Sequence, residues 1–178
     1  VDSPRAVGLA GAMNQLARQA RSEYLARMDD DDVSDPDRLM KQVQVLEEDR
    51  LDLVGSACVE IDDVGNASVV KNMPLDEAAI RSTLRWRSPF IHPSIIIRKS
   101  VFESLGGYDE GLLRNQDYDL WFRFVDSGFH ARNMSETLLR WRRSSGAMRR
   151  RSFSLLKWDL IVKSRHLSRS PFLIPSVL

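Results

Sequence analysis

The chain has 178 residues, of which 43% are hydrophobic and 29% are charged, and its formal net charge is +1. This length and composition predict one globular α/β domain with a buried core. Cys58 is the sole cysteine, which excludes a disulfide framework and a zinc cluster, and its apolar neighbours predict a buried side chain. No apolar run approaches the roughly 20 residues of a membrane span and no signal peptide is visible, so we expect a chain that is cytoplasmic or peripheral on the inner face of the cell membrane.

Helices and strands are predicted to alternate along the chain. Periodicity and capping residues predict helices over 7–21, 35–48, 74–86, 100–105 and 115–124. Strands are predicted over 23–26, 52–61, 94–98, 129–133 and 137–142, with a hairpin turn over 62–66 and a glycine loop over 106–111.

Four consecutive aspartates, Asp29 to Asp32, follow the first predicted strand directly. In open α/β sheets, ligands bind at the carboxyl ends of strands, so this position favours a site. Adjacent carboxylates repel one another, and aspartate is poor strand material, so local stability does not explain these residues. Mg²⁺ and Mn²⁺ take one or two protein carboxylates and complete their coordination with water and phosphate oxygens. The cluster therefore predicts a divalent-metal site for a phosphate-bearing substrate.

Other interpretations of the acidic cluster stay open. The acids could form a solvated loop that favours the positive end of the next helix. The pattern from Asp29 to Val33 also resembles the Asp-x-Asp-x-Val nucleophile motif of haloacid-dehalogenase-type phosphatases, although no convincing second acidic motif of that family follows. A calcium loop of the EF-hand type is excluded, because its glycine and its distal glutamate are missing.

Two further acids lie in the first turn of the helix predicted over 115–124. Asp117 and Asp119 could be partners of the helix dipole, or one of them could be a general base beside a substrate pocket. Their spacing alone does not decide between these roles.

Cations dominate from Arg140 onward, where Asp159 is the sole acid. We expect a domain over 1–146 and a basic amphipathic tail over 147–178, whose helix begins near the arginine run 149–151. This helix could lie on an anionic membrane, or it could pack on the domain with its arginines solvated. Nucleic acid is not an expected partner, because no recognised nucleic-acid motif accompanies the charge.

Several motifs, taken together and in order, resemble those of the family 2 glycosyltransferases, which are inverting enzymes of the GT-A fold. They are Gly8 with Asn14, the segment 20–34, the segment 36–39 with Gln42, and the segments 92–98, 106–110 and 116–123. The resemblance implies an α/β fold of the GT-A class, Rossmann-like, with a mixed sheet flanked by helices. It also implies that the first nucleotide-binding βαβ portion is missing, because nothing before Val7 supplies it.

The resemblance also implies residue roles. Asp29 and Asp31 would hold Mn²⁺ or Mg²⁺ on the diphosphate of a nucleotide-sugar donor, and Asp117 would be the catalytic base. The same resemblance assigns Arg27 and Asp30 to the donor side of the site, and His92, Gly107, Tyr108 and Gln116 to the acceptor side.

The implied reaction moves a sugar from a nucleotide-diphosphate sugar to a hydroxyl of a saccharide or lipid-linked acceptor, in polysaccharide or glycolipid synthesis. Two motif residues depart from the family pattern: Gln116 replaces the usual glutamate before the base, and Ser144 follows the arginine-rich segment 140–143 where a histidine is often found. The alternative is an inactive or non-catalytic GT-A fragment with a binding role. The donor sugar, the acceptor and the oligomeric state are not encoded in any recognisable motif.

Overall fold

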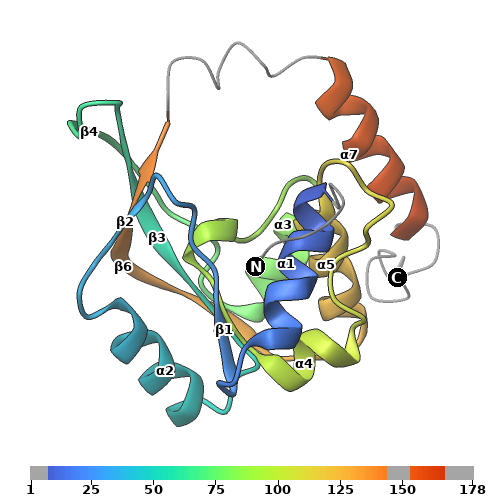
Figure 1. Ribbon diagram of the computed structural model, residues 1–178, viewed down its shortest axis with the longest axis horizontal. Coiled ribbons are helices and arrows are strands. Elements are labelled where there is room, and N and C mark those ends of the chain that lie inside the picture. The colour runs from blue at the N-terminus through green and yellow to red at the C-terminus, as the bar shows by residue number, and fades with distance from the viewer. Residues whose placement is uncertain (1–7, 144–152, 167–178) are drawn as a thin grey trace, which may run out of the picture.

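A mixed β-sheet runs through the centre of the computed structural model, which describes residues 8–143 and 153–166 (Figure 1). Its strands are β1 (Tyr24–Ala26), β2 (Val33–Ser34), β3 (Leu53–Ile61), β4 (Ala67–Lys71), β5 (Ile96–Arg98) and β6 (Ala131–Arg142). The helices are α1 (Gly8–Gln19), α2 (Arg38–Glu48), α3 (Glu77–Leu84), α4 (Lys99–Ser104), α5 (Gln116–Asp126) and α7 (Phe153–His166), with a 3₁₀ turn η1 (His92–Ser94). The expected alternation of helices and strands is confirmed.

The sheet has the strand order β1-β5-β3-β6-β2, and β4 pairs with β3 as the second strand of a hairpin. Strands β3 and β6 are parallel, whereas the other neighbouring pairs are antiparallel. Parallel strands require a long crossover connection, and the segment between β3 and β6 contains α3, α4 and α5. The predicted mixed sheet with flanking helices is therefore confirmed.

The prediction of two strands over 129–133 and 137–142 is wrong, because β6 is one strand of 12 residues. Its pairing with β3 slips where Ser56 faces Met134 and the next residue, Ala57, faces Thr137. The two residues between these partners bulge out of the ladder without ending it. The gap predicted between two strands is thus a bulge within one strand.

The two faces of the sheet bury different helices. Alternate residues of β3 divide between them: Leu53 packs in a core cluster with residues of α1, α3, α4, α5 and α7, whereas Val54 packs with Leu46 of α2. Figure 1 shows α2 apart from the other helices. Cys58 lies fully buried in a third cluster with Leu139, as predicted, and burial raises the pKa of its thiol to about 12.

The helix after the acidic cluster begins later than predicted. Asp35 accepts a hydrogen bond from the backbone N–H of Asp37 through Oδ1, at 2.9 Å, and so forms a turn instead of capping the helix. Asp37 occupies the N-cap position of α2, and its side chain accepts no capping hydrogen bond. Proline at position 36 still fits, because the chain is turning there.

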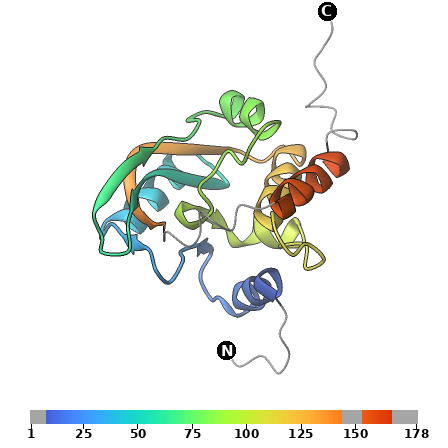
Figure 2. The same cartoon turned by 90° about the horizontal axis from the view of Figure 1, so that it is seen from above.

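Helix α7 packs on the domain beside α5 (Figure 2). Val162 is fully buried in the main core cluster, and Trp158 and Ile161 pack against that cluster. The ammonium group of Lys163 donates to the carbonyl of Trp86 at 2.9 Å and pairs with Asp159. The arginines at 149–151 and the predicted boundary at 146 lie outside the described residues. Among the helices of the described segments, none is long and apolar enough to cross a bilayer.

Candidate functional site

The site is built around the turn that follows β1. The backbone N–H of Arg27 donates to the carbonyl of Ile95 at 3.0 Å, which extends the pairing of β1 with β5 by one residue. The guanidinium of Arg27 then pairs with Oδ2 of Asp29 at 2.6 Å. The first aspartate of the cluster is therefore held at the carboxyl end of its strand, as predicted from the order of the elements.

A buried network of hydrogen bonds holds the backbone before this turn. Arg38 is 2% exposed, and its Nη2 donates to the carbonyl of Arg27 at 2.8 Å while its Nε donates to Gln42 at 3.0 Å. Gln42 in turn donates to the carbonyl of Ser94 at 2.8 Å. Burial lowers the pKa of Arg38 to about 10, so it remains protonated at neutral pH. Because these donors reach strand-end carbonyls, they fix the backbone on which Asp29 is carried.

Arg142, the last residue of β6, forms hydrogen bonds with the C-terminal end of the acidic cluster. Its backbone N–H donates to Oδ1 of Asp32 at 2.8 Å, and its Nε donates to the carbonyl of Asp31 at 2.9 Å. Asp32 is 6% exposed, and burial raises its pKa, as do the nearby carboxylates of Asp29 and Asp31. Asp32 therefore shapes the turn, whereas its three predecessors remain at the surface or half-buried.

The carboxylates fit a hard divalent cation of the predicted kind. Asp31 is exposed, and its carboxylate accepts no hydrogen bond from the described residues. Asp29 is beside it and keeps one oxygen outside its ion pair with Arg27. No group of three or more potential metal-ligating side chains is found in segments 8–143 and 153–166. That donor set suits Mg²⁺ or Mn²⁺ shared with a diphosphate, because these ions need only one or two protein carboxylates.

His92 and Tyr108, two residues of the predicted acceptor side, contact each other. Nε2 of His92 lies 2.7 Å from the hydroxyl of Tyr108, and their rings meet edge to face with centroids 5.5 Å apart. Burial lowers the pKa of His92 to about 4, although the carboxylates of Asp117 and Asp29 both raise it. At neutral pH the imidazole is therefore uncharged. The carboxylates of Asp117 and Asp29, far apart in the chain, thus both act electrostatically on His92.

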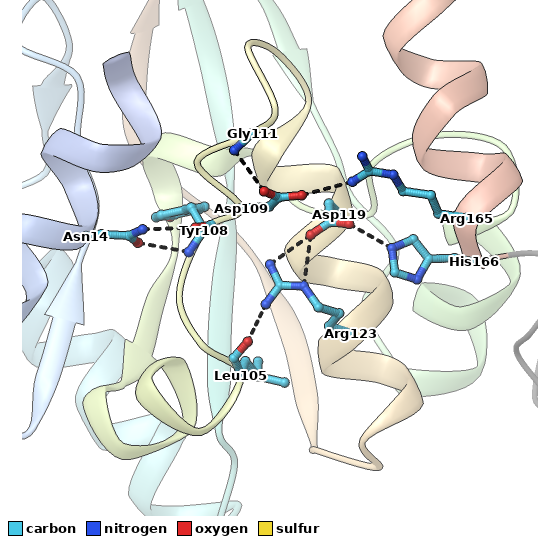
Figure 3. Close-up of polar contacts among 9 residues, drawn as sticks. All are labelled: Asn14, Leu105, Tyr108, Asp109, Gly111, Asp119, Arg123, Arg165 and His166. Carbon is cyan, nitrogen blue, oxygen red and sulfur yellow. Dashed lines mark hydrogen bonds and ion pairs between the residues drawn. The ribbon is translucent and has the colours of Figure 1, made fainter. Parts of the chain in front are cut away.

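The backbone of Tyr108 is held by Asn14 of α1. The side chain of Asn14 accepts from the N–H of Tyr108 and donates to its carbonyl, both at 2.9 Å (Figure 3). Gly107 has a φ of +69°, and a Cβ there would lie 2.6 Å from Oδ1 of Asn14. Glycine is therefore required at 107 by both backbone conformation and space.

The structure separates the two acids at the start of α5. Asp119 is 4% exposed and its carboxylate is occupied by Arg123 and His166. Asp117 is half-buried, and it raises the pKa values of both His92 and Tyr108. Gln116, the preceding residue, is buried at 7% exposure. Of the two candidate bases, Asp117 is thus the one near the predicted acceptor side.

A cavity of about 520 Å³ lies between α1 and the strands β1 and β5. Arg27, Asp29, Asp30 and Tyr108 line it, so predicted donor-side and acceptor-side residues share one opening. Its remaining lining is largely apolar and comes from α1, with Met13 and Leu16, and from the strands. The other predicted site residues do not line this cavity, although Gly107 adjoins Tyr108 and His92 contacts it; they are Asp31, His92, Gly107, Gln116 and Asp117.

Sequence reasoning placed Asp32 in the acidic cluster without a role of its own, and it gave no role to Arg142 or His166. Their contacts join residues far apart in the chain, which no local pattern reveals. Asn14 was noted only as part of a motif. Its side chain holds Tyr108, which a pattern confined to α1 does not reveal.

Comparison with known proteins gives a consistent result. Residues 1–106 match the family described as "Glycosyl transferase family 2". The putative glycosyltransferase EpsE of Bacillus subtilis is 36% identical over 151 residues, which are 82% of this chain and 52% of EpsE. The amylovoran biosynthesis glycosyltransferase AmsE of Erwinia amylovora is 31% identical over 86% of this chain and 58% of its own length. This chain therefore spans about half the length of the curated relatives that it matches.

A solved structure of S. aureus TarS, residues 1–349, in complex with UDP-GlcNAc superposes with a TM-score of 0.69 at 13% identity. The superposition covers 92% of this chain and 48% of that one. It confirms the expected GT-A class of fold. The family match extends over more than half of the residues, and it agrees with the relatives in sequence. The chain therefore belongs to glycosyltransferase family 2.

Proposed function

We propose that this chain carries the metal, donor and base residues of an inverting glycosyltransferase that moves a sugar from a nucleotide-diphosphate sugar to an acceptor hydroxyl. The TarS structure was solved with UDP-GlcNAc, and a second TarS structure with UDP, which supports a nucleotide-sugar donor. Relatives named for amylovoran and O-antigen biosynthesis support a saccharide or lipid-linked acceptor in polysaccharide or glycolipid synthesis.

One observation carries this proposal. Asp29 follows β1 and Asp117 lies in the first turn of α5, yet the carboxylates of both act electrostatically on the half-buried imidazole of His92. Inverting transfer requires one group near the leaving diphosphate and another near the attacking hydroxyl. An acid after β1 and an acid at the start of α5 that both act electrostatically on His92 would match these two requirements.

Asp117 is proposed as the base. In a single in-line displacement, the acceptor oxygen forms a bond to the anomeric carbon as the bond from that carbon to the diphosphate oxygen breaks. The acceptor proton passes to the carboxylate of Asp117, and the electron pair of the broken bond leaves with the diphosphate. A positioned base of this kind contributes about 10²- to 10⁴-fold in rate.

Asp31 and Asp29 are proposed as the metal ligands on the donor side, with Asp30 and Arg27 contacting the donor. Bound Mn²⁺ or Mg²⁺ would offset the charge that develops on the leaving diphosphate. Arg27 contributes in a second way, because its ion pair with Asp29 holds that carboxylate in the turn. The cavity beside these residues has room for part of a donor.

His92, Gly107, Tyr108 and Gln116 are proposed to form the acceptor side. A neutral His92 can form a hydrogen bond with the hydroxyl of Tyr108 without adding a positive charge to the acceptor side. Gly107 allows the close approach of Asn14 that fixes Tyr108. These residues would orient the acceptor hydroxyl toward Asp117 rather than react with it.

Peripheral contact with an anionic membrane stays part of this proposal. Leu156 and Leu160 are exposed on α7 at 57% and 59%, and cations dominate the sequence from Arg140 onward. Flotation with vesicles of phosphatidylglycerol and phosphatidylcholine tests the contact. Replacing both leucines by serine should reduce the bound fraction, and an unchanged fraction would exclude this face.

The function is tested by incubating the full-length protein with UDP-GlcNAc, Mn²⁺ and a panel of saccharide and undecaprenol-linked acceptors. We expect product formation that EDTA abolishes and that added Mn²⁺ restores. Donor binding without transfer to any acceptor would favour the non-catalytic alternative. Transfer that resists EDTA would contradict the proposed metal.

A further inference from the structure

The last turn of α7 contacts the first turn of α5. Nε2 of His166 lies 2.8 Å from Oδ1 of Asp119, and because a carboxylate only accepts, Nε2 carries the proton (Figure 3). The imidazole also stacks on Phe122, with ring centroids 4.9 Å apart and an interplanar angle of 2°. Two independent contacts therefore set the position of this ring on α5.

The second oxygen of Asp119 continues the connection. Nε and Nη2 of Arg123 both lie 2.8 Å from Oδ2, and Nη1 of Arg123 donates to the carbonyl of Leu105 (Figure 3). Burial on its own would raise the pKa of Asp119, but the hydrogen bond from His166 and the charge of Arg123 outweigh it and hold the pKa below its usual value. Asp119 is therefore an ionised link between α7 and the end of α4.

A parallel contact fastens the loop that carries Tyr108. The guanidinium of Arg165 lies 2.9 Å from Oδ2 of Asp109, whose other oxygen accepts the N–H of Gly111 at 2.8 Å (Figure 3). Asn14 holds the neighbouring Tyr108 from the opposite side, in α1. The loop is thus tied to α1 on one side and to α7 on the other.

The start of α5 depends on such tertiary contacts. Asn115 occupies the N-cap position in a left-handed conformation, with φ at 59°, and its side chain makes no capping hydrogen bond. Asp117 lies in this uncapped turn, two residues before Asp119. Anchoring Asp119 therefore restrains the backbone that carries Asp117.

We propose that His166 is a positioning residue, which acts through Asp119 to hold Asp117 against the acceptor side of the site. The inference rests on the proposed role of Asp117 as the base. It makes α7 part of the transfer machinery rather than a separate tail. His166 itself touches neither substrate nor the reacting atoms.

Two substitutions separate the hydrogen bond from the stacking contact. His166→Phe keeps an aromatic ring on Phe122 and removes the donor. His166→Gln keeps a donor the same number of bonds from the backbone and removes the ring. Lys157→Gln is the matched control on α7, because Lys157 is exposed and makes no hydrogen bond or ion pair with the described residues. The transfer rate of each variant is measured in the full-length protein with UDP-GlcNAc, Mn²⁺ and an acceptor to which the wild type transfers sugar.

We expect His166→Phe to lower kcat about ten- to hundred-fold, the effect of losing a hydrogen bond to a buried charge, with an unchanged KM for the donor. His166→Gln should recover most of the rate, and Lys157→Gln should match the wild type. Wild-type kcat in His166→Phe, while Asp117→Asn is inactive, would overturn the inference and leave the proposed function intact. Equal losses in His166→Phe and His166→Gln would also overturn it.

Hydrogen exchange of the 178-residue chain supplies a readout that does not depend on transfer. In His166→Phe, the amides of residues 119–121 should exchange about ten-fold faster or more, whereas His166→Gln should stay close to the wild type. If the wild type transfers no sugar, the proposed function fails, and these amides alone decide the positioning role. Unchanged protection in His166→Phe would overturn it.

Discussion

The backbone N–H of Arg142 donates to Oδ1 of Asp32 across 2.8 Å and so joins the end of β6 to the acidic turn. The side chain of Arg142 adds hydrogen bonds to the carbonyls of Asp31 and Asp62, at 2.9 and 2.6 Å. The proposed metal ligand Asp31 therefore lies on a turn that is held by a strand far along the chain. This relationship gives the acidic cluster a defined shape before any ligand binds.

Arg142→Gln should weaken metal-dependent donor binding about ten-fold, because the acidic turn loses the side-chain hydrogen bond to the carbonyl of Asp31, while Asp32 keeps its backbone partner. Arg140→Gln is the matched control on the same strand, since Arg140 is exposed and its side chain makes no hydrogen bond or ion pair with the described residues. Calorimetric titration of UDP-GlcNAc with Mn²⁺ measures both. Equal affinity in the two variants would show that Arg142 does not shape the site.

Gly107→Ala should destabilise the fold by about 2–4 kcal/mol. A left-handed residue other than glycine costs about 1–2 kcal/mol, and the new Cβ would also displace Asn14 from Tyr108. Gly106→Ala is the control, because its φ of +78° is similar but a Cβ there meets nothing within 4 Å. Urea unfolding compares them, and a cost at Gly107 no larger than at Gly106 would refute the role of Asn14.

Stability should fall on mild acidification because of His92. Its pKa is lowered from 6.5 to about 4 in the folded chain, so the unfolded chain binds the proton more readily between these values. The contribution of neutral His92 is present above pH 6.5 and is lost as the pH falls toward 4. Between pH 7 and pH 5 we expect a loss of about 2 kcal/mol.

His92→Gln isolates the contribution of His92 to the pH dependence of stability, because glutamine can still form a hydrogen bond with the hydroxyl of Tyr108 but does not titrate. Unfolding free energies at pH 7 and pH 5 should differ by about 2 kcal/mol less in the variant than in the wild type. The same pH dependence in both proteins would mean that His92 is not held in its neutral form.

Local sequence predicted those parts of the structure that depend on neighbouring residues. The strand before Asp29, the hairpin after β3 and the helix with Asp117 in its first turn each follow from periodicity and turn chemistry within a few positions. The choice between Asp117 and Asp119 could not follow in this way. It depends on α7, whose His166 occupies Asp119 from a helix far along the chain.

Two local predictions were wrong for physical reasons. Two strands were predicted over 129–133 and 137–142, but the pairing of β6 with β3 continues between them through a bulge. Asp35 suggested a helix cap, but its carboxylate closes a turn before Asp37. The phosphatase interpretation of Asp29 to Val33 is also wrong, because the chain belongs to another family.

The assignment of the two acids is tested most directly by comparing Asp117→Asn with Asp31→Asn in the full-length protein. Asp31→Asn should abolish Mn²⁺-dependent binding of the nucleotide-sugar. Asp117→Asn should bind the donor as the wild type does and lose transfer by about 10²- to 10⁴-fold, because only the acceptor proton lacks a base. Wild-type transfer in Asp117→Asn would contradict the central claim that this carboxylate is the base.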